Sequence, residues 1–168
     1  SFQGVGEMAA NFARVRAGSG LAPVRVLVHF SRSLDRDTLD RLSASGLRLV
    51  GPLPDRAFIV RVSHVGQLAV LSEAGATWLG ALYPQDNMPP RIGRDGIGLW
   101  ALRSENTADL RLKYYPDEDP ELVRLLLEAL GGTVLATSSL TTEYTVNMPV
   151  DQLQVLAFAD SIRWLEEM

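Results

Sequence analysis

The stretch LRLKYYPDEDPELVRLLLEALGGTVLATSSLTTEYTVNM occupies residues 110–148 and carries four elements: strand, helix, strand, strand. Near its end, Tyr144, Val146 and Met148 alternate with polar residues, which predicts a strand that buries one face. An apolar strand is expected again near the end of the sequence, after a further short helix. The order of elements is therefore strand–helix–strand–strand–helix–strand.

The helix of this stretch has clear predicted ends. Asp119-Pro120-Glu121 combines an N-cap carboxylate, a proline at the first turn and an acid that the helix dipole favours. Gly131-Gly132 ends the helix, because glycine adopts the left-handed cap conformation that a β-carbon disfavours. Between these ends we predict one core-facing apolar stripe, formed by Leu122, Leu125, Leu126, Ala129 and Leu130.

Residues 24–82 repeat the pattern of residues 110–168. We predict a single offset of 86 through all four strands, with a one-residue adjustment in the helices only. The matching helix of the first repeat is expected from about Asp35 to Ser45, ending at Gly46. The tryptophans of the final strands are interpreted as core residues. The offset is carried by the pairs Val24/Leu110, Val26/Leu112, Val28/Tyr114, Gly46/Gly132, Leu49/Leu135, Phe58/Tyr144, Val60/Val146, Val62/Met148, Trp78/Trp164 and Leu79/Leu165.

This pattern predicts an α+β protein with two tandem ferredoxin-like βαββαβ domains. Each domain is expected to have a four-stranded antiparallel sheet with two helices on one face, so the other face is the natural place for a partner. The predicted domains are residues 24–84 and 108–168. Residues 85–107 are a Pro/Gly-rich linker, expected to pack as an arm or to contact a partner. Residues 1–23 form an N-terminal segment with a short helix around Met8–Val15.

Composition excludes several classes of function. The net charge of −4 and the pI near 5.2 disfavour nucleic-acid binding. No apolar run approaches the roughly 20 residues of a membrane span, so we expect no membrane insertion. The absence of cysteine excludes disulfides and thiolate metal sites.

Motifs for catalysis or cofactor binding are not found. His29 and His64 lack metal-ligand spacing, and surface or capping roles are favoured for both. The GRDGIG stretch at residues 93–98 lacks the ending of a phosphate-binding loop. The acids Asp117-Glu118-Asp119 are interpreted as a solvated helix start instead of a calcium loop. We predict no enzyme activity, no metal and no cofactor.

Two quoted stretches carry a family resemblance. LRLVGPLPDRAFIVRV at residues 47–62, followed by a helix with LAVL and then TWLGALYP, resembles the propeptide domain of subtilisin-like serine proteases. Residues 133–168 resemble the same domain more closely, in their strand, turn, strand, P-x-x-x-L-x-x-L helix and final apolar strand with an acidic pair. The doubling is similar to the tandem N-terminal regions of some large bacterial subtilases.

The resemblance implies a function by binding. Such propeptides lay their sheet on surface helices of the protease, assist its folding and inhibit it with a C-terminal tail. The expected partner is a subtilisin-like catalytic domain in cis or in trans, in an extracellular or periplasmic location. By position, Glu166 and Glu167 lead into the tail, and Met168 stands where the family's tail would continue or where a product would end. These three are the predicted partner-binding residues.

Two other classes of function stay open at this point. One is a protein-interaction scaffold of two ferredoxin-like units that takes no part in protease maturation. The other is a tandem regulatory pair that senses a small molecule. The second class would need a Gly-rich turn after the first strand, and SRSLDRD at residues 31–37 does not supply one.

Overall fold

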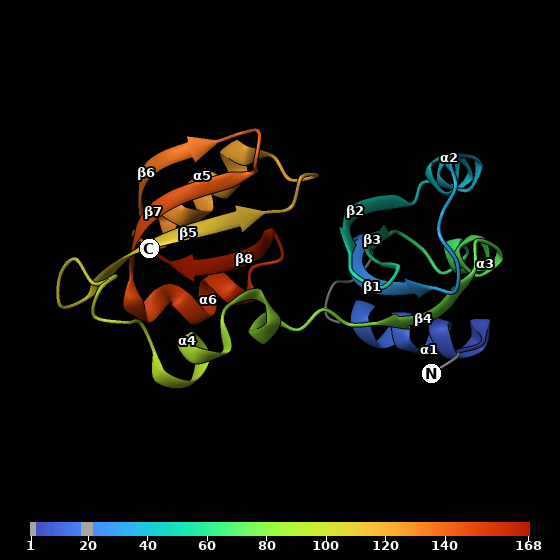
Figure 1. Cartoon of the computed structure of the whole chain (residues 1–168), viewed down its shortest axis with the longest axis horizontal. Helices are drawn as coiled ribbons and strands as arrows, with labels where there is room; N and C mark the ends of the chain where they lie inside the picture. The colour runs from blue at the N-terminus through green and yellow to red at the C-terminus, as the bar shows by residue number, and fades with distance from the viewer. Residues whose placement is uncertain (1–2, 18–21) are drawn as a thin grey trace. The chain divides into compact units, whose positions relative to one another are not determined.

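The computed structural model describes residues 3–17 and 22–168, with Pro84 and Gln85 described by their backbone alone. The chain forms two compact units, Ser1–Leu82 (unit 1) and Tyr83–Met168 (unit 2). Each unit contains its own sheet and its own helices (Figure 1). Among the described residues, no helix is both long and apolar enough to cross a membrane.

The elements of the two units follow the predicted order, with an additional helical segment before each first strand. In unit 1 they are α1 (Val5–Arg16), β1 (Val24–Phe30), α2 (Arg36–Ala44), β2 (Arg48–Leu53), β3 (Ala57–Val62), α3 (Gln67–Glu73) and β4 (Ala76–Gly80). In unit 2 they are the 3-10 helix η1 (Pro84–Asn87), α4 (Pro90–Asp95), β5 (Thr107–Tyr114), α5 (Pro120–Ala129), β6 (Thr133–Ser138), β7 (Glu143–Pro149), the 3-10 helix η2 (Val150–Gln152), α6 (Leu153–Phe158) and β8 (Ile162–Glu167).

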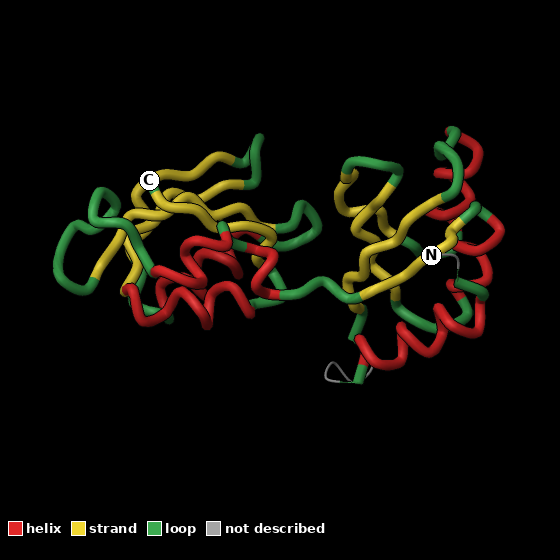
Figure 2. Tube along the Cα trace, turned by 60° about the horizontal axis from the view of Figure 1, so that its bottom comes forward, coloured by secondary structure: helices red, strands yellow, loops and turns green. Residues whose placement is uncertain are grey.

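The two sheets have the same topology. The strand order is β2-β3-β1-β4 in unit 1 and β6-β7-β5-β8 in unit 2, and every neighbouring pair is antiparallel. In unit 2 the helices lie against one side of the sheet (Figure 2). The predicted fold class, two tandem ferredoxin-like βαββαβ units in an α+β protein, is confirmed.

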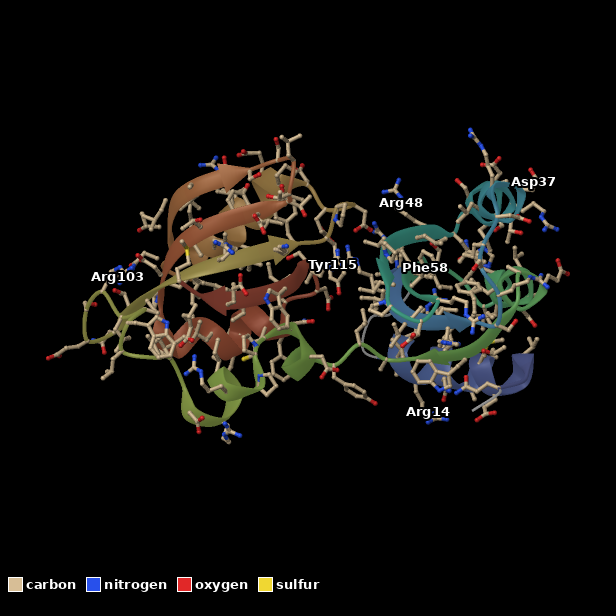
Figure 3. The ribbon with its side chains drawn as sticks, viewed as in Figure 1. Arg14, Asp37, Arg48, Phe58, Arg103 and Tyr115 are labelled. Carbon is tan, nitrogen blue, oxygen red and sulfur yellow. The ribbon has the colours of Figure 1, made fainter. Side chains whose placement is uncertain are left out.

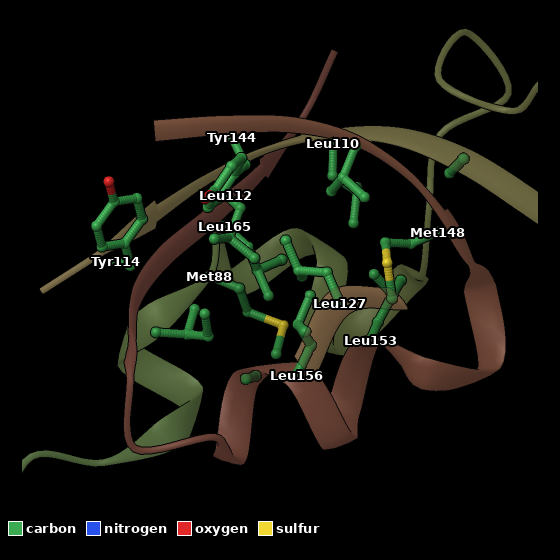
Figure 4. Close-up of a cluster of buried hydrophobic side chains, with 14 of the residues drawn as sticks. Met88, Leu110, Leu112, Tyr114, Leu127, Tyr144, Met148, Leu153, Leu156 and Leu165 are labelled. Carbon is green, nitrogen blue, oxygen red and sulfur yellow. The ribbon is translucent and has the colours of Figure 1, made fainter. Parts of the chain in front are cut away.

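Each unit has a separate hydrophobic core under its sheet. In unit 2, side chains from the strands interlock with Leu127 of α5 and with Leu153 and Leu156 of α6 (Figure 4). Helix α5 contacts this core through Val123 and Leu127, whereas Leu122 and Leu125 are 61% and 53% exposed. The predicted stripe was therefore wrong by one helix position: the i, i+4 row that faces the sheet starts at Val123.

The predicted helix ends are confirmed. The Asp119 side chain accepts a hydrogen bond from the Glu121 amide at the start of α5 (2.9 Å), and Asp35 accepts one from the Thr38 amide at the start of α2 (2.8 Å). Both helices end at a glycine with positive φ, +85° at Gly46 and +83° at Gly131. Gly131, and not Gly132, is thus the counterpart of Gly46.

The single offset of 86 is wrong, because two residues are inserted in unit 2. An aromatic pair links the first and third strands of each unit: Phe30 with Phe58 at 5.8 Å between ring centroids, and Tyr114 with Tyr144 at 5.4 Å. Phe30 therefore matches Tyr114, an offset of 84, while Phe58 matches Tyr144 at 86. A shift of two keeps every first-strand residue on its predicted face.

The inserted residues are found at two places. Helix α5 has ten residues and α2 has nine. The second insertion lies in the hairpin between the second and third strands. In unit 1 this hairpin connects the paired residues Leu53 and Ala57, and in unit 2 it connects Ser138 and Glu143, which are one residue further apart in the sequence. The second strand consequently has an offset of 85. Its residue Leu49 matches the core-facing Val134, and the predicted partner Leu135 is 53% exposed.

The predicted linker belongs to unit 2. Met88 and Ile92 are buried in the core of that unit, and the Asn87 side chain donates to the carbonyl of Ile162 on β8 (3.3 Å). The unit boundary falls between Leu82 and Tyr83 instead of at residues 85–107. Part of the predicted arm still points outward, since Leu99 and Trp100 are 84% and 62% exposed.

The predicted N-terminal segment belongs to unit 1, within the part that is described; residues 1–2 and 18–21 lie outside it. The expected short helix is present as α1, and its residues Met8 and Phe12 are buried in the core. Gln3 and Asn11 hydrogen-bond along β4: the Gln3 side chain accepts from the Leu79 amide (3.0 Å), and the Asn11 side chain donates to the Leu79 carbonyl (3.1 Å). The exposed edge of the sheet is thereby protected.

Candidate functional site

The open face of unit 1 is the side of its sheet that points away from the main core cluster, although Ile59 on this side is itself buried. Because side chains alternate along a strand, the residues between the core positions point to this side. The four strands contain neither Asp nor Glu, so the face carries apolar, cationic and neutral polar groups but no acid from its strands. By strand register it comprises Arg25, Leu27, His29, Arg48, Leu53, Ala57, Ile59, Arg61, Trp78 and Gly80.

A pocket of about 660 Å³ opens on this face where β1, β3 and β4 run side by side. Its wall combines an indole, two apolar residues, an imidazole, a guanidinium and two hydroxyls. The pocket is a shallow hollow that is more open to solvent than enclosed. The lining residues are Leu27, His29, Ser31, Arg56, Ala57, Thr77 and Trp78.

The corresponding face of unit 2 is covered by paired charges. Lys113 contacts Glu143 at 3.1 Å and Arg111 contacts Glu166 at 3.1 Å. The Thr141 hydroxyl donates to Glu143 (2.8 Å), and this hydrogen bond, together with Lys113, lowers the pKa of that carboxyl below its ordinary value.

The same face extends toward the loop before β5. Asp109 accepts a hydrogen bond from Asn147 (2.7 Å) and forms an ion pair with Arg103 (2.6 Å), a residue of that loop (Figure 3). Each of these charged groups of unit 2 has an intramolecular partner.

The difference between the faces is visible position by position. Three of the charged residues of unit 2 correspond to small or apolar residues of unit 1, whereas Lys113 corresponds to a histidine and Asp109 to Arg25. Where unit 2 forms ion pairs across its strands, unit 1 therefore leaves a hollow with a cationic end. With the offsets found above, Arg111 matches Leu27, Lys113 matches His29, Glu143 matches Ala57, and Glu166 matches Gly80.

The tryptophans of the last strands are not core residues, contrary to the prediction. Trp78 pairs across the strands with His29, and Trp164 with Lys113, so both lie on the open faces and both are half-buried. The indole of Trp164 donates to Glu166 (3.3 Å). The interpretation as core residues failed because β4 and β8 each bury Leu79 or Leu165 next to the tryptophan.

The predicted partner-binding residues have intramolecular contacts in unit 2. The Glu167 side chain is 7% exposed and accepts hydrogen bonds from the Arg91 guanidinium and from the Gly98 amide. Glu166 pairs with Arg111 on the open face, and the Met168 amide donates to the Asp109 carbonyl (3.1 Å). Glu167 thus attaches the segment after α4 to β8, and partner binding by Glu166, Glu167 and Met168 stays a prediction.

The remaining motifs have structural contacts. His64 precedes α3, where its amide and that of Ser63 donate to the buried Gln67 side chain. Asp119 caps α5, as predicted. Within the described ranges, no group of three or more histidine, aspartate or glutamate residues is placed to hold a metal ion.

The pocket was not predicted from the sequence, although a signal was available. The four strands of unit 1 lack acids, whereas those of unit 2 contain Asp109, Glu143, Glu166 and Glu167. This difference in acid content between the two repeats could have indicated that the basic residues are paired with strand acids on the face of unit 2 alone. The role of Arg56 could not have been inferred, because it depends on the conformation of the hairpin.

Comparisons with known proteins add little to this description. The model of a family described as "Domain of unknown function (DUF8729)" matches residues 5–83, which is close to the extent of unit 1. No curated protein matches the sequence. Among solved structures, the small subunit of acetolactate synthase from Thermotoga maritima is 15% identical, with 86% of this chain and 90% of that chain covered and a TM-score of 0.25. This chain's own strand order, and not that neighbour, is what establishes the ferredoxin-like fold.

Proposed function

We propose that this chain is a noncatalytic protein-binding region, of the kind that accompanies subtilisin-like serine proteases as a chaperone or inhibitor. The observation that carries the proposal is the open face of unit 1, apolar and cationic on a sheet whose strands contain no acid. The resemblance of both repeats to subtilase propeptides supplies the class of partner.

The two units are suited to different tasks under this proposal. The face of unit 1 offers apolar area that a partner can cover, and burial of apolar area drives association. At its pocket, His29 and Arg56 favour contact with acidic residues or with the C-terminal ends of helices. The face of unit 2 would have to give up paired charges on binding, which costs desolvation free energy. Unit 1 is therefore the proposed docking unit.

Because the sheet is held rigid by its own core, it can dock without ordering a flexible segment first. Preorganisation of this kind reduces the conformational entropy lost on binding. Tail inhibition through Glu166, Glu167 and Met168 is a separate expectation, because it involves the end of β8 and not the open face of unit 1.

The test is binding of this chain to a purified subtilisin-type catalytic domain, followed by calorimetry and by the yield of refolded protease. The key variant is Leu27→Arg with Ala57→Glu, which installs on unit 1 the residues found at the same places in unit 2. The matched control is Arg111→Leu with Glu143→Ala in unit 2.

We expect the unit 1 variant to weaken binding at least tenfold and the unit 2 variant to leave it within twofold. Failure of the wild-type chain to bind or to assist refolding would contradict the proposed function. Equal weakening by both variants would contradict the assignment of docking to unit 1.

The pocket favours a second candidate, in which unit 1 takes up a small molecule. Its volume of about 660 Å³ would hold such a ligand, and its wall mixes apolar and polar groups as ligand sites do. This candidate corresponds to the small-molecule-sensing class considered above. If the chain bound a small molecule at this pocket and bound no protein, that result would favour this candidate over the protein-binding function.

A further inference from the structure

The pocket of unit 1 has one flat aromatic wall. Trp78 extends over the backbone of Gly80, and a β-carbon at position 80 would overlap the indole ring. The glycine therefore permits the ring to lie along the sheet instead of standing away from it. In unit 2 the matching position is Glu166, whose carboxylate receives the indole N–H of Trp164 (3.3 Å). The aromatic wall of unit 1 lacks that internal acceptor.

The other end of the pocket is cationic and held in place by the hairpin between β2 and β3. Asp55 and Arg56 both have positive φ, +60° and +59°. The Phe30 amide donates to the Arg56 carbonyl (3.0 Å), and the Arg56 guanidinium donates to the Ser31 carbonyl (3.0 Å). Thr142 has a similar positive φ in the matching hairpin of unit 2, so the conformation belongs to the turn of the repeat, and what distinguishes unit 1 is the guanidinium that the turn places at the pocket.

A guanidinium with five N–H donors can hold a carboxylate in addition to the Ser31 carbonyl. His29 lines the same pocket and can donate a further hydrogen bond. The four strands that form this face contain neither Asp nor Glu. The complement of such a site is an anion with an apolar group attached, since the indole offers a surface for stacking.

We infer that this pocket receives an acidic side chain of a partner protein, with the neighbouring apolar side chain of the partner packed on Trp78. The carboxylate would lie at the Arg56 and His29 end. This inference rests on the proposed protein-binding function and specifies the chemistry of the segment that is bound.

The proposal can be tested by NMR titration of the full chain with the peptide acetyl-Leu-Asp-Phe-amide. The matched probe is acetyl-Leu-Asn-Phe-amide, which is almost the same size but uncharged. We expect the Asp peptide to shift the indole signal of Trp78 and the amides of Ala57 and Thr77, with an affinity at least fivefold higher than that of the Asn peptide. Signals of Trp164 should stay unchanged.

Two variants assign the binding to the named groups. Gly80→Ala should displace the Trp78 ring and lower the affinity for the Asp peptide at least threefold. Arg56→Gln should abolish the preference for Asp over Asn, and Arg56→Lys should restore part of it. The backbone amide signals of the core strand residues Val26, Val28 and Val60 report whether unit 1 is folded in each variant, so that loss of binding is separated from loss of structure.

The outcomes are distinguishable. Equal affinity for both peptides, or shifts outside the pocket, would overturn the inference. Free propionate binding as tightly as the Asp peptide would also overturn it, in favour of a small-molecule ligand. If a protease domain binds through this face while the peptides do not, the inference fails and the proposed function stands. If the Asp peptide binds while the protease domain does not, the protease partner is wrong.

Discussion

The two units share a core and differ on the open face of the sheet. Equivalent core positions are occupied by Val26 and Leu110, and by Val28 and Leu112, all of them fully buried. On the opposite side, the ion pairs of unit 2 are replaced in unit 1 by a pocket beside Trp78. A repeat thus preserves what the fold requires, and its surface is where the two copies can take different functions.

The comparison also extends to the segment before each first strand. Met8 and Phe12 of α1 are buried in unit 1, and Met88 and Ile92 are buried in unit 2 with the same i, i+4 spacing. Each helical segment lies beside the last strand of its own unit. The repeat therefore comprises the whole of each unit, Ser1–Leu82 and Tyr83–Met168, and the segments predicted as an N-terminal tail and as a linker have similar places in it.

The largest expected effects come from the shared core. Leu42→Ala in unit 1 and Leu127→Ala in unit 2 truncate equivalent, fully buried residues at the ends of α2 and α5. Each should lower the free energy of unfolding of its own unit by about 2–5 kcal/mol, through lost burial and a residual cavity. Denaturant titration followed by the NMR signals of Trp78 and Trp164 measures the two units separately.

In that experiment, each variant should shift only the transition of the unit that contains it. The control variants are Leu39→Ala in unit 1 and Leu122→Ala in unit 2, which truncate exposed leucines of the same helices. They should lower the free energy of unfolding much less than the core variants do. Destabilisation of both units by either core variant would contradict the separation of the two cores.

Much of the fold could be predicted because it is encoded locally. Alternation predicted the faces of the first and third strands, and the Asp119 and Gly131 signals predicted the ends of α5. The repeat supplied the topology. The offset was mispredicted because apolar alternation is unchanged by a shift of two residues, so the pattern alone cannot distinguish 84 from 86 in the first strand.

The candidate site was less predictable because it depends on contacts between distant residues. Trp78 has an apolar neighbour at Leu79, and only the strand register decides which of the two faces the core. The pocket further requires Gly80 under the indole and the positive φ of Arg56. Neither requirement is visible in the residue types, and the acid-free strands were the only local indication.

The second expected effect concerns α4 and the segment after it, both of which Glu167 attaches to β8. Glu167→Gln removes the charge that holds Arg91 and the Gly98 amide on β8. Because the carboxylate is almost fully buried, we expect a loss of about 1–3 kcal/mol in the stability of unit 2. Glu166→Gln on the open face is the control, with an expected loss below about 1 kcal/mol. Equal losses would show that the buried pair has no special structural role.

A third effect separates the units at high pH. Burial raises the pKa of Tyr144, whose hydroxyl donates to the Pro120 carbonyl (2.7 Å); its counterpart in unit 1 is Phe58, which does not titrate. A raised folded-state pKa gives stability that is present below the unfolded-state pKa of about 10 and is lost as pH rises through the folded-state pKa.

Tyr144→Phe tests this assignment. At pH 7 it should cost unit 2 about 1 kcal/mol, for the lost hydrogen bond. Above pH 10 the variant should lose less stability than the wild type with each further rise in pH. Denaturation midpoints of both units at pH 7, 10 and 11 provide the measurement, and an unchanged alkaline slope would assign the effect to other tyrosines.

The smallest effect compares the hairpins. Arg56 and Thr142 are equivalent, since the Phe30 amide donates to the carbonyl of Arg56 and the Tyr114 amide donates to that of Thr142, both at 3.0 Å. Both have positive φ, which a β-branched residue tolerates poorly, so Thr142→Gly should stabilise unit 2 by about 1 kcal/mol. Arg56→Gly relieves similar strain but removes the guanidinium from the Ser31 carbonyl, and the net change in unit 1 should be near zero. Chemical denaturation of both variants measures the difference. If Arg56→Gly were as stabilising as Thr142→Gly, the contact of the guanidinium with the Ser31 carbonyl would contribute nothing to the stability of unit 1. The role of Arg56 would then lie in binding alone.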